Sequence, residues 1–556
     1  MRKKISVLLS ILVAAVLTLA ACSGGGSKSD EGGKGGVKSE KSENVLNLSS
    51  TSDIPTMDSS LATDQVSFFT FNQTLEGLYV LDKDDNPAPG VAEADPEKSA
   101  DGKTWTIKLR DNAKWSNGDP VTAHDFVYAW QRTVDPDTAA EYAYMFENIE
   151  NAKDITAGKK KPEELGVKAI DDKTLEIKLI KDVPWMQSLF AFGSFMPQNE
   201  KFVEKQGKKF GTTADATLSN GPFIMKEWKT EDNWKLVPNK EYWDKDKVKL
   251  KEVNYKVVKE VQTAINMYQT GKLDTVGLDA SNVTKYKDRE DFSTQLNSSN
   301  YFFRINKTKN KDLANEDLRK AFAKSIDKEQ YVKSLLNNGS VPSDKLMVKD
   351  FVKDEDGKDY IDGVKSPLGY DKEEAKKLLE KAKKATGKDK FNIELLTYDA
   401  DESKKAAEFV KEQVEKNLPG VTLKIKQQPF KQKLALESKG DYDISFAGWG
   451  PDYPDSTTFL DLFKKNSPHN QTGYANAEYD KALEEANSDE MLKDENSEKR
   501  TKLLQDAETK FLDSASIGPL YQQGVARLRQ PYVKNWQPHK FGGDYSLKEV
   551  EIAGAK

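Results

Sequence analysis

Two side chains on a short proline-containing segment, Trp449 and Asp452, are the strongest candidates for binding chemistry in this sequence. The segment, residues 446–455, reads Phe-Ala-Gly-Trp-Gly-Pro-Asp-Tyr-Pro-Asp. Gly448 and Gly450 flank the indole, and glycine lets another molecule approach the backbone closely. The two prolines fix φ and lower the cost of ordering the segment. An aromatic wall beside one carboxylate suits a ligand with an ammonium group, such as the amino end of a peptide.

A purely structural role also fits this segment. A strand is expected to end at residue 446, and a helix is expected at 456–463. Asp455 directly precedes Ser-Thr-Thr, so its side chain is suited to cap that helix. Asp452 would then belong to a stiff turn. The residues alone leave both interpretations open.

Residues 391–446 are expected to place the segment at the edge of a parallel sheet. Strand-like and helix-like patterns alternate there. The expected order is a strand at 391–398, a helix at 403–416, a strand at 421–426, a helix at 430–438 and a strand at 442–446. This order implies parallel strands with helical crossovers. Ligands of open parallel sheets bind beyond the carboxyl ends of strands, so the position favours a binding role.

The rest of the chain mixes strand and helix patterns, which indicates an α/β protein of several domains. Residues 166–170 and 174–179 are expected to form a hairpin across an Asp-Asp turn. A helix expected at 371–385 begins with the capping pair Asp371 and Glu374.

The N-terminus predicts export and membrane attachment. Basic residues, an apolar stretch and small residues form a secretory signal at 1–21, which is too short to span a membrane. Cys22 is the only cysteine, and Leu-Ala-Ala-Cys resembles a bacterial lipobox, in which the cysteine is lipidated. The alternative is an ordinary signal peptide with an incidental cysteine. Residues 22–45 form a flexible polar tether. We expect lipid anchoring at Cys22 on the outer face of the cell membrane.

Composition excludes several kinds of protein. The 85 basic and 91 acidic residues give a net charge of -6, which does not indicate a nucleic-acid partner. A single cysteine excludes an internal disulfide and a cysteine-rich metal site. With only three histidines, all scattered, no metal site is expected, and no cofactor.

An enzyme is the competing hypothesis from another class. The carboxylates Asp443, Asp452 and Asp455 are close in sequence, as a glycosidase pair would be, but no supporting pattern accompanies them. A Ser-His-Asp hydrolase would need one histidine near a nucleophile motif, and none of the three occupies such a position: His124, His469 and His539. The aromatic run at 228–243 fits lobe packing better than a sugar platform. We therefore expect no catalysis.

Several motifs together resemble the oligopeptide-binding lipoproteins that serve ATP-binding-cassette peptide importers in Gram-positive bacteria. The resemblance covers residues from about 46 to about 550. It is carried by Asn86–Glu93, Asp119–Tyr128, Gly166–Asp172, Ser219–Pro222, Asn315–Asp327 and Ala447–Tyr453.

The resemblance implies a two-lobe, periplasmic-binding-protein-like α/β fold with an inserted α+β domain. Two hinge strands would cross between the lobes near 301–306 and 520–524. The implied boundaries are lobe I at 46–80, 196–300 and 523–556, the inserted domain at 81–195, and lobe II at 301–522.

The resemblance also assigns a site. It implies that Asp452 binds the N-terminal ammonium of a peptide held in extended form, mainly through its backbone. Trp449, Gly448, Gly450 and Tyr142 would contact that peptide.

One departure concerns the other end of the peptide. Gram-negative relatives hold the C-terminal carboxylate with basic residues, at positions where this chain has Phe446 and Glu437. The sequence therefore leaves the C-terminal anchor open.

The implied function is a monomeric receptor that captures oligopeptides between closing lobes. It would deliver them to the membrane permease subunits of an ATP-binding-cassette importer. A signalling-peptide receptor or an oligosaccharide binder on the same fold stays open as an alternative.

Overall fold

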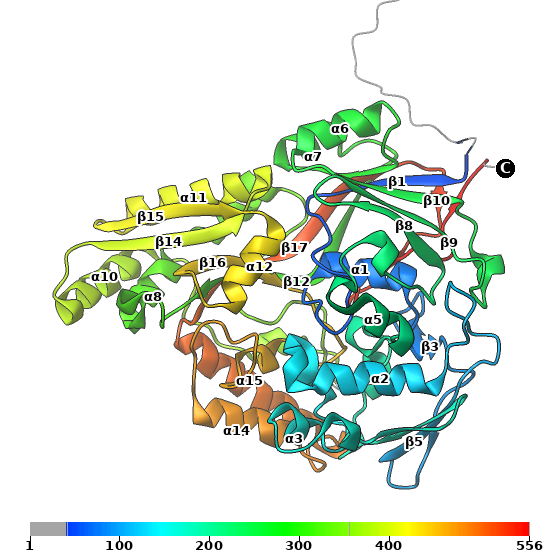
Figure 1. Cartoon of the computed structure of the whole chain (residues 1–556). Helices are drawn as coiled ribbons and strands as arrows, with labels where there is room; N and C mark the ends of the chain where they lie inside the picture. Colours follow the sequence, from blue (N-terminus) through cyan, green and yellow to red (C-terminus); the bar gives the residue numbers. More distant parts are fainter. Residues whose placement is uncertain (1–40, 42, 355, 555–556) are drawn as a thin grey trace, which may run out of the picture. The chain divides into compact units, whose positions relative to one another are not determined.

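The computed structural model describes residues 41, 43–354 and 356–554 (Figure 1). Its helices are α1 (Gln65–Thr74), α2 (Ala123–Val134), α3 (Ala152–Thr156), α4 (Met186–Leu189), α5 (Glu200–Gln206), α6 (Val261–Gln269), α7 (Ala280–Tyr286), α8 (Glu316–Lys324), α9 (Lys328–Gln330), α10 (Lys372–Thr386), α11 (Asp401–Asn417), α12 (Phe430–Ser438), α13 (Thr457–Leu460), α14 (Ala477–Ala486) and α15 (Ser497–Asp513).

The largest sheet has seven strands and positions the candidate segment. Its order is β11-β17-β12-β16-β14-β15, with β13 paired to β17. The bounds are β11 (Thr275–Gly277), β12 (Phe292–Ile305), β13 (Val341–Pro342), β14 (Phe391–Tyr398), β15 (Val421–Gln428), β16 (Ile444–Trp449) and β17 (Ile517–Arg529). Strand β14 runs parallel to both β15 and β16, which confirms the predicted crossover unit. The sheet as a whole is mixed, because β12 is antiparallel to β16 and β17.

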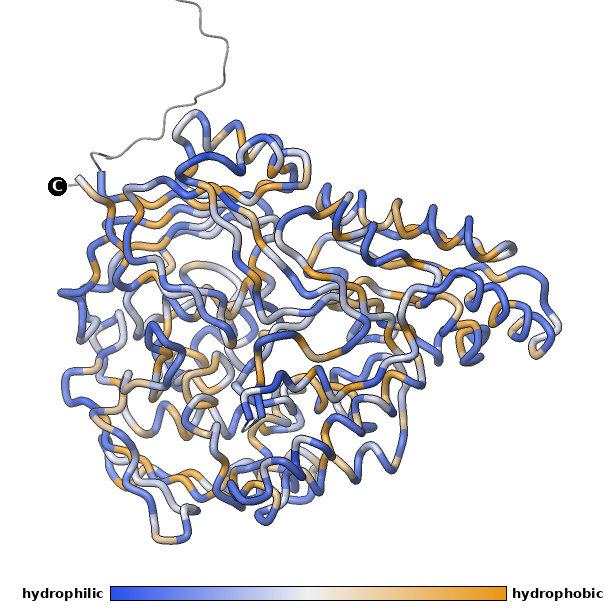
Figure 2. The backbone as a smooth tube through the Cα atoms, turned by 180° about the vertical axis from the view of Figure 1, so that it is seen from behind, coloured by the Kyte–Doolittle hydropathy of each residue, from blue (hydrophilic) through white to orange (hydrophobic). Residues whose placement is uncertain are grey.

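Helices cover both faces of the parallel part of this sheet. Helix α11 lies over β14 and β15 on one side, and α8 and α10 lie on the other (Figure 1). Apolar residues recur along each helix at the spacing that faces the sheet, as the colour changes in Figure 2 show. The predicted cap of α10 is confirmed, since Asp371 accepts a hydrogen bond from the Glu374 backbone N–H at 2.9 Å.

Strand β16 is longer at its carboxyl end than the sequence predicted. It was expected to end at Phe446, but it continues to Trp449. Strand β12 supplies the reason, because Tyr301 pairs with Gly448 and Asn300 pairs with Trp449. The chain therefore leaves the sheet only at Gly450.

Strands β12 and β17 are the two longest strands among the described residues, at 14 and 13 residues. They are antiparallel neighbours, with Tyr301 opposite Tyr521. The pairing register shifts between Leu296 and Asn300 and again between Tyr301 and Phe302. Such irregularities bend a strand pair locally. The two expected crossing segments lie in this pair.

The remaining strands form smaller sheets. A four-stranded sheet has the order β1-β10-β9-β8 and a second has the order β4-β5-β7-β6; β2-β3, β18-β21 and β19-β20 are two-stranded. Their bounds are β1 (Val45–Ser50), β2 (Tyr79–Leu81), β3 (Pro87–Pro89), β4 (Glu97–Lys98), β5 (Thr104–Lys108), β6 (Val167–Asp171), β7 (Thr174–Lys178), β8 (Phe223–Lys229), β9 (Asn233–Pro238), β10 (Glu252–Val257), β18 (Val533–Lys534), β19 (Gln537–Pro538), β20 (Tyr545–Ser546) and β21 (Glu551–Ile552).

Two local predictions fall in these sheets. Strands β6 and β7 form the expected antiparallel hairpin. In the aromatic run, Trp234 is fully buried and stacks on Tyr255, with ring centroids 4.6 Å apart. That side chain therefore packs inside the protein rather than forming an exposed platform.

The signal peptide and Cys22 lie outside the described residues. Near the end of the expected tether, the Lys41 ammonium donates to the Asp274 carboxylate at 2.8 Å. Contacts with the body therefore begin before residue 45. Within the described ranges, no helix is both long enough and apolar enough to cross a membrane.

Candidate functional site

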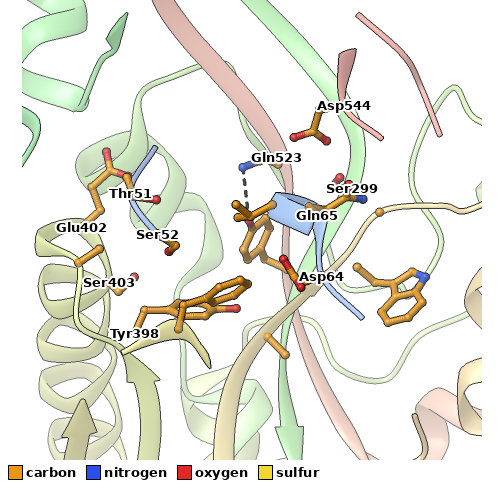
Figure 3. A pocket seen from close by; sticks show the side chains of 18 of the residues that line it. Thr51, Ser52, Asp64, Gln65, Ser299, Tyr398, Glu402, Ser403, Gln523 and Asp544 are labelled. Atoms are coloured by element: carbon orange, nitrogen blue, oxygen red, sulfur yellow. Dashed lines mark hydrogen bonds between the residues drawn. The ribbon is translucent and has the colours of Figure 1, made fainter. Parts of the chain in front are cut away.

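A cavity of about 610 Å³ opens beside the carboxyl end of β16. Its lining comes from distant parts of the chain, as Figure 3 shows for Asp64, Glu402 and Asp544. All five residues predicted to bind the ligand line this one cavity: Tyr142, Gly448, Trp449, Gly450 and Asp452.

Asp452 has a buried carboxylate with spare hydrogen-bonding capacity. The residue is 2% exposed, and its backbone N–H donates to Thr458 Oγ1 at 2.8 Å, which fixes its position. Oδ1 accepts a long hydrogen bond of 3.4 Å from the Tyr142 hydroxyl, and Oδ2 has no partner among the described residues. Burial raises the pKa of Asp452 well above the usual carboxyl range, although the Tyr142 hydrogen bond acts against this. Burial therefore shifts this carboxyl toward its protonated form.

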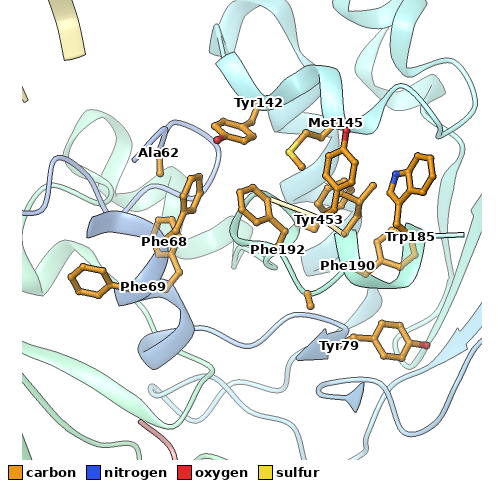
Figure 4. Close-up of a cluster of buried hydrophobic side chains, with 14 of the residues drawn as sticks. Ala62, Phe68, Phe69, Tyr79, Tyr142, Met145, Trp185, Phe190, Phe192 and Tyr453 are labelled. Atoms are coloured by element: carbon orange, nitrogen blue, oxygen red, sulfur yellow. The ribbon is translucent and has the colours of Figure 1, made fainter. Parts of the chain in front are cut away.

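Aromatic rings form the wall beside this carboxylate. Trp449 stacks on Tyr142 with ring centroids 6.2 Å apart and an interplanar angle of 12°. His469 packs its edge against Trp449, with centroids 4.9 Å apart. On its other side Tyr142 joins the aromatic core through Phe68 and Phe192 (Figure 4). The core thus holds the wall rigidly in place.

The two glycines have close neighbours within the protein itself. A Cβ on Gly448 would lie 2.9 Å from the Tyr301 ring, and a Cβ on Gly450 would lie 2.9 Å from Gln65 Nε2. From the sequence, we expected these glycines to leave room for an external molecule to approach the backbone. The structure shows that the same absence of a side chain also lets β16 pack against Tyr301.

Asp455 has a second role that the sequence did not predict. As expected, it accepts a hydrogen bond at the start of the helical turn, from the Thr457 N–H at 3.0 Å. It also forms a two-pronged ion pair with Arg500, at 2.7 and 2.8 Å. The helical segment ends where it was expected to, since α13 spans Thr457–Leu460 and a 3-10 turn continues over Asp461–Phe463.

Most of the cavity lining carried no recognisable signal in the sequence. The clearest example is His469, which stands in the polar sequence Ser-Pro-His-Asn at 467–470 but is 2% exposed beside Trp449. Burial, reinforced by the charge of Arg304, lowers the pKa of His469 to about 3, so the imidazole is neutral at pH 7. Asp64 caps α1, and burial raises its pKa to about 6. An acidic residue at a helix N-cap indicates a structural role in a sequence. The position of Asp64 in the cavity was therefore not predicted.

The two positions noted for the peptide C-terminus also line the cavity. Phe446 packs its ring against Tyr301, with centroids 5.7 Å apart. Glu437 is buried and accepts hydrogen bonds from the Lys433 ammonium at 2.8 Å and the Ser445 hydroxyl at 2.7 Å. The carboxylate at 437 is therefore neutralised by a basic residue of its own helix.

The carboxylates considered for catalysis do not converge. Asp443 accepts from the Glu394 N–H at 2.9 Å and Asp455 pairs with Arg500, whereas Asp452 faces the cavity. No cluster of three or more His, Cys, Asp or Glu in the described part of the chain is arranged to hold a metal ion.

One histidine does form a hydrogen-bonded chain of the serine-hydrolase type. His539 Nδ1 lies 2.9 Å from Asp85 Oδ1, and its Nε2 lies 2.8 Å from Ser546 Oγ. No sequence motif indicated this arrangement. The cavity lined by both His539 and Ser546 measures about 30 Å³, which is room for little more than a water molecule. The chain of hydrogen bonds therefore serves to join the β19–β20 hairpin to the turn at Asp85.

Comparison with known proteins places this chain in a family. The model for bacterial extracellular solute-binding proteins, family 5 (middle region), matches residues 86–471. The chain belongs to this family. Family 5 membership confirms both the predicted resemblance and the two-lobe solute-binding fold.

Three family 5 relatives illustrate the similarity. Oligopeptide-binding protein OppA of Bacillus subtilis is 35% identical over 535 residues, which cover 94% of each chain. The solved structure of Listeria monocytogenes OppA bound to peptide has a TM-score of 0.89 and 44% identity, and the match covers 92% of this chain and 100% of that one. The pheromone receptor PrgZ has a TM-score of 0.87 and 35% identity, with 92% and 99% covered. All three are named as binding or receptor proteins.

Proposed function

We propose that this protein captures oligopeptides outside the cytoplasm and delivers them to an ATP-binding-cassette importer. The peptide lies extended in the cavity, with its N-terminal ammonium on Asp452. The observation that carries this proposal is the buried carboxylate, whose Oδ2 lacks a partner among the described residues. An ammonium ion supplies the missing donors and charge. The protein acts as a monomer and binds no nucleic acid.

The edge of β16 supports backbone recognition. Strand β14 pairs with β16 only at Ile444 and Ser445. Beyond Ser445, no strand in the described part of the chain pairs with that side of β16, while β12 pairs with the opposite side as far as Trp449. An extended peptide can add to such an open edge through main-chain hydrogen bonds. Binding of this kind depends little on the peptide's side chains.

Mass spectrometry of the ligand that copurifies with the protein tests this function. We expect a ladder of assorted peptides, as a nutrient receptor would carry. One defined peptide would instead indicate a signalling receptor, an alternative that the similarity to PrgZ favours. A copurifying oligosaccharide would contradict both.

We also propose that Cys22 is lipidated and anchors the protein to the outer face of the membrane. The lipobox and the polar tether at 22–45 support this. Because a diacylglycerol carries two acyl chains, the anchor is stable where a single chain is marginal. Cys22→Ala is expected to release the protein from cells or block its processing. A mature cell-bound form that begins at another residue would refute the proposal.

The strand order of the sheets supports the proposed division into lobes and an inserted domain. All strands of the β4-β5-β7-β6 sheet fall within the proposed inserted domain, 81–195. The β1-β10-β9-β8 sheet joins the proposed lobe I pieces 46–80 and 196–300. Strands β12 and β17 run across the proposed boundaries at 300/301 and 522/523.

Closure of the lobes about β12 and β17 follows from this division. The register shifts in that strand pair are suited to absorb bending. Small-angle scattering is expected to show a smaller radius of gyration when peptide is added to ligand-free protein. An unchanged radius, with binding confirmed by calorimetry, would count against closure.

A further inference from the structure

A second group of buried charges lines the same cavity, around Arg304 of β12. Arg304 is 5% exposed and lies opposite Ser445 of β16. Its Nη1 donates to the Gln471 side chain and lies 3.9 Å from Glu437 Oε1. Because β12 and β16 are neighbouring strands, the guanidinium is held by the sheet that also carries Trp449.

Two basic and two acidic side chains meet in this group. Glu437 lies between Arg304 and Lys433, whose ammonium is 2.8 Å from Glu437 Oε1. Burial opposes ionisation of Glu437, but the charges of Lys433 and Arg304 outweigh it and lower the pKa of this carboxyl. The second acid, Glu141, accepts from the Ser438 hydroxyl at 2.6 Å and lies 3.7 Å from His469 Nδ1. Lys433 and Ser445 hold Glu437 at hydrogen-bond distance, whereas the Arg304 guanidinium is 3.9 Å from it.

Two buried nitrogen atoms in this group lack a hydrogen-bond partner within the described ranges, Arg304 Nε and His469 Nε2. Both side chains line the cavity, and both are more than nine-tenths buried. Gln471 links them, since its side chain accepts from Arg304 and its backbone N–H donates to the His469 carbonyl at 2.8 Å. Leaving the buried Arg304 Nε–H unpaired is costly, so this donor points to an acceptor on a ligand, and the neutral His469 ring places a second polar atom beside it.

We infer that Arg304, with His469 beside it, forms a carboxylate-binding subsite of the cavity. This inference rests on the proposed peptide-binding function. A carboxylate offers acceptor oxygens and a charge that suit a guanidinium. It comes either from the C-terminus of the peptide or from an acidic side chain.

The strand register relates this subsite to the aromatic wall beside Asp452. Trp449 follows Ser445, the residue opposite Arg304, by four positions, which is about 13 Å along β16. An extended peptide covers that length in about four residues. Opposite charges at the two positions would fix the direction in which the peptide lies.

Calorimetry with four peptides of five residues tests the subsite. All have a free amino terminus: penta-alanine, its C-terminal amide, and two amidated peptides with Glu or Gln at position four. The four peptides form two pairs, each with an acidic member and a neutral twin: free and amidated penta-alanine, and the Glu and Gln peptides. In one of these pairs, we expect the wild type to bind the acidic member at least about tenfold more tightly than its neutral twin. A preference for free penta-alanine identifies the C-terminus, and a preference for Glu over Gln identifies a side chain.

Arg304→Gln is expected to reduce that preference to about twofold or less. Arg304→Lys keeps the positive charge but loses the planar guanidinium, and it is expected to retain part of the preference for the acidic peptide. The inference is overturned if the wild type binds all four peptides equally, a result that needs no variant to fold. It is also overturned if Arg304→Gln keeps the full preference. Failure of the wild type to bind any peptide would instead refute the proposed function.

Discussion

Asp452→Asn is expected to weaken the binding of a peptide with a free amino terminus by about 30-fold or more. Breaking a charge pair in a water-poor site costs on the order of 2–5 kcal/mol, because the partner charge is left buried without compensation. A surface ion pair contributes only about 0–1 kcal/mol. The larger value applies here because Asp452 is 2% exposed. Titration calorimetry measures the affinity.

Loss of binding in this variant will not reflect unfolding. The pKa of Asp452 is raised in the folded protein, so the folded state holds its proton more tightly than the unfolded state. Stability from this group is therefore greatest below the ordinary carboxyl pKa and declines as pH rises above it. Asparagine removes the free-energy cost of ionising a buried carboxyl, so the variant should be at least as stable as the wild type at pH 7. A folded Asp452→Asn protein with wild-type affinity would disprove the assignment.

Asp455→Asn, three residues further on, is expected to lower the free energy of unfolding by about 3 kcal/mol and to leave peptide affinity nearly unchanged. The change weakens a helix-capping bond and removes the charge opposite Arg500. The Asp455 and Arg500 side chains are only 9% and 14% exposed, so water compensates poorly for the lost partner. Guanidinium unfolding, followed by tryptophan fluorescence, measures the change.

A surface pair provides the matched control for this prediction. Asp489 pairs with Lys103 at 3.1 Å, and its side chain is 60% exposed. Asp489→Asn is expected to change the free energy of unfolding by less than about 1 kcal/mol. Equal losses from the two variants would show that the Asp455–Arg500 pair is no stronger than a surface contact. A large fall in affinity from Asp455→Asn would place Asp455 in the binding site.

The parts of the fold that depend on local pattern were predictable. The crossover unit from β14 to β16 shows regular periodicity, and Asp371 and Gly387 mark the two ends of α10. The end of β16 was not predictable, because pairing with β12 extends the strand to Trp449. That pairing joins segments about 150 residues apart in the chain.

The residues of the candidate site also fall into a predictable and an unpredictable group. Trp449 and Asp452 were found because unusual residues follow a strand end, and Tyr142 because of a family resemblance. Arg304 and His469 were missed, because a charged residue in a strand and a histidine in a polar loop both look like surface residues. Only the tertiary structure brings them into the same cavity.

Binding of one peptide and its N-acetylated twin to the wild-type protein tests the central claim most directly. Calorimetry from about pH 5 to about pH 7, where a peptide amine stays protonated, is the suitable measurement. The free peptide should bind far more tightly than the acetylated one. Its affinity should rise with pH, because the ammonium binds the ionised form of Asp452 and burial raises the pKa of that carboxyl. Equal affinities for the two peptides, with the same pH dependence, would contradict the assignment of Asp452 as the ammonium site.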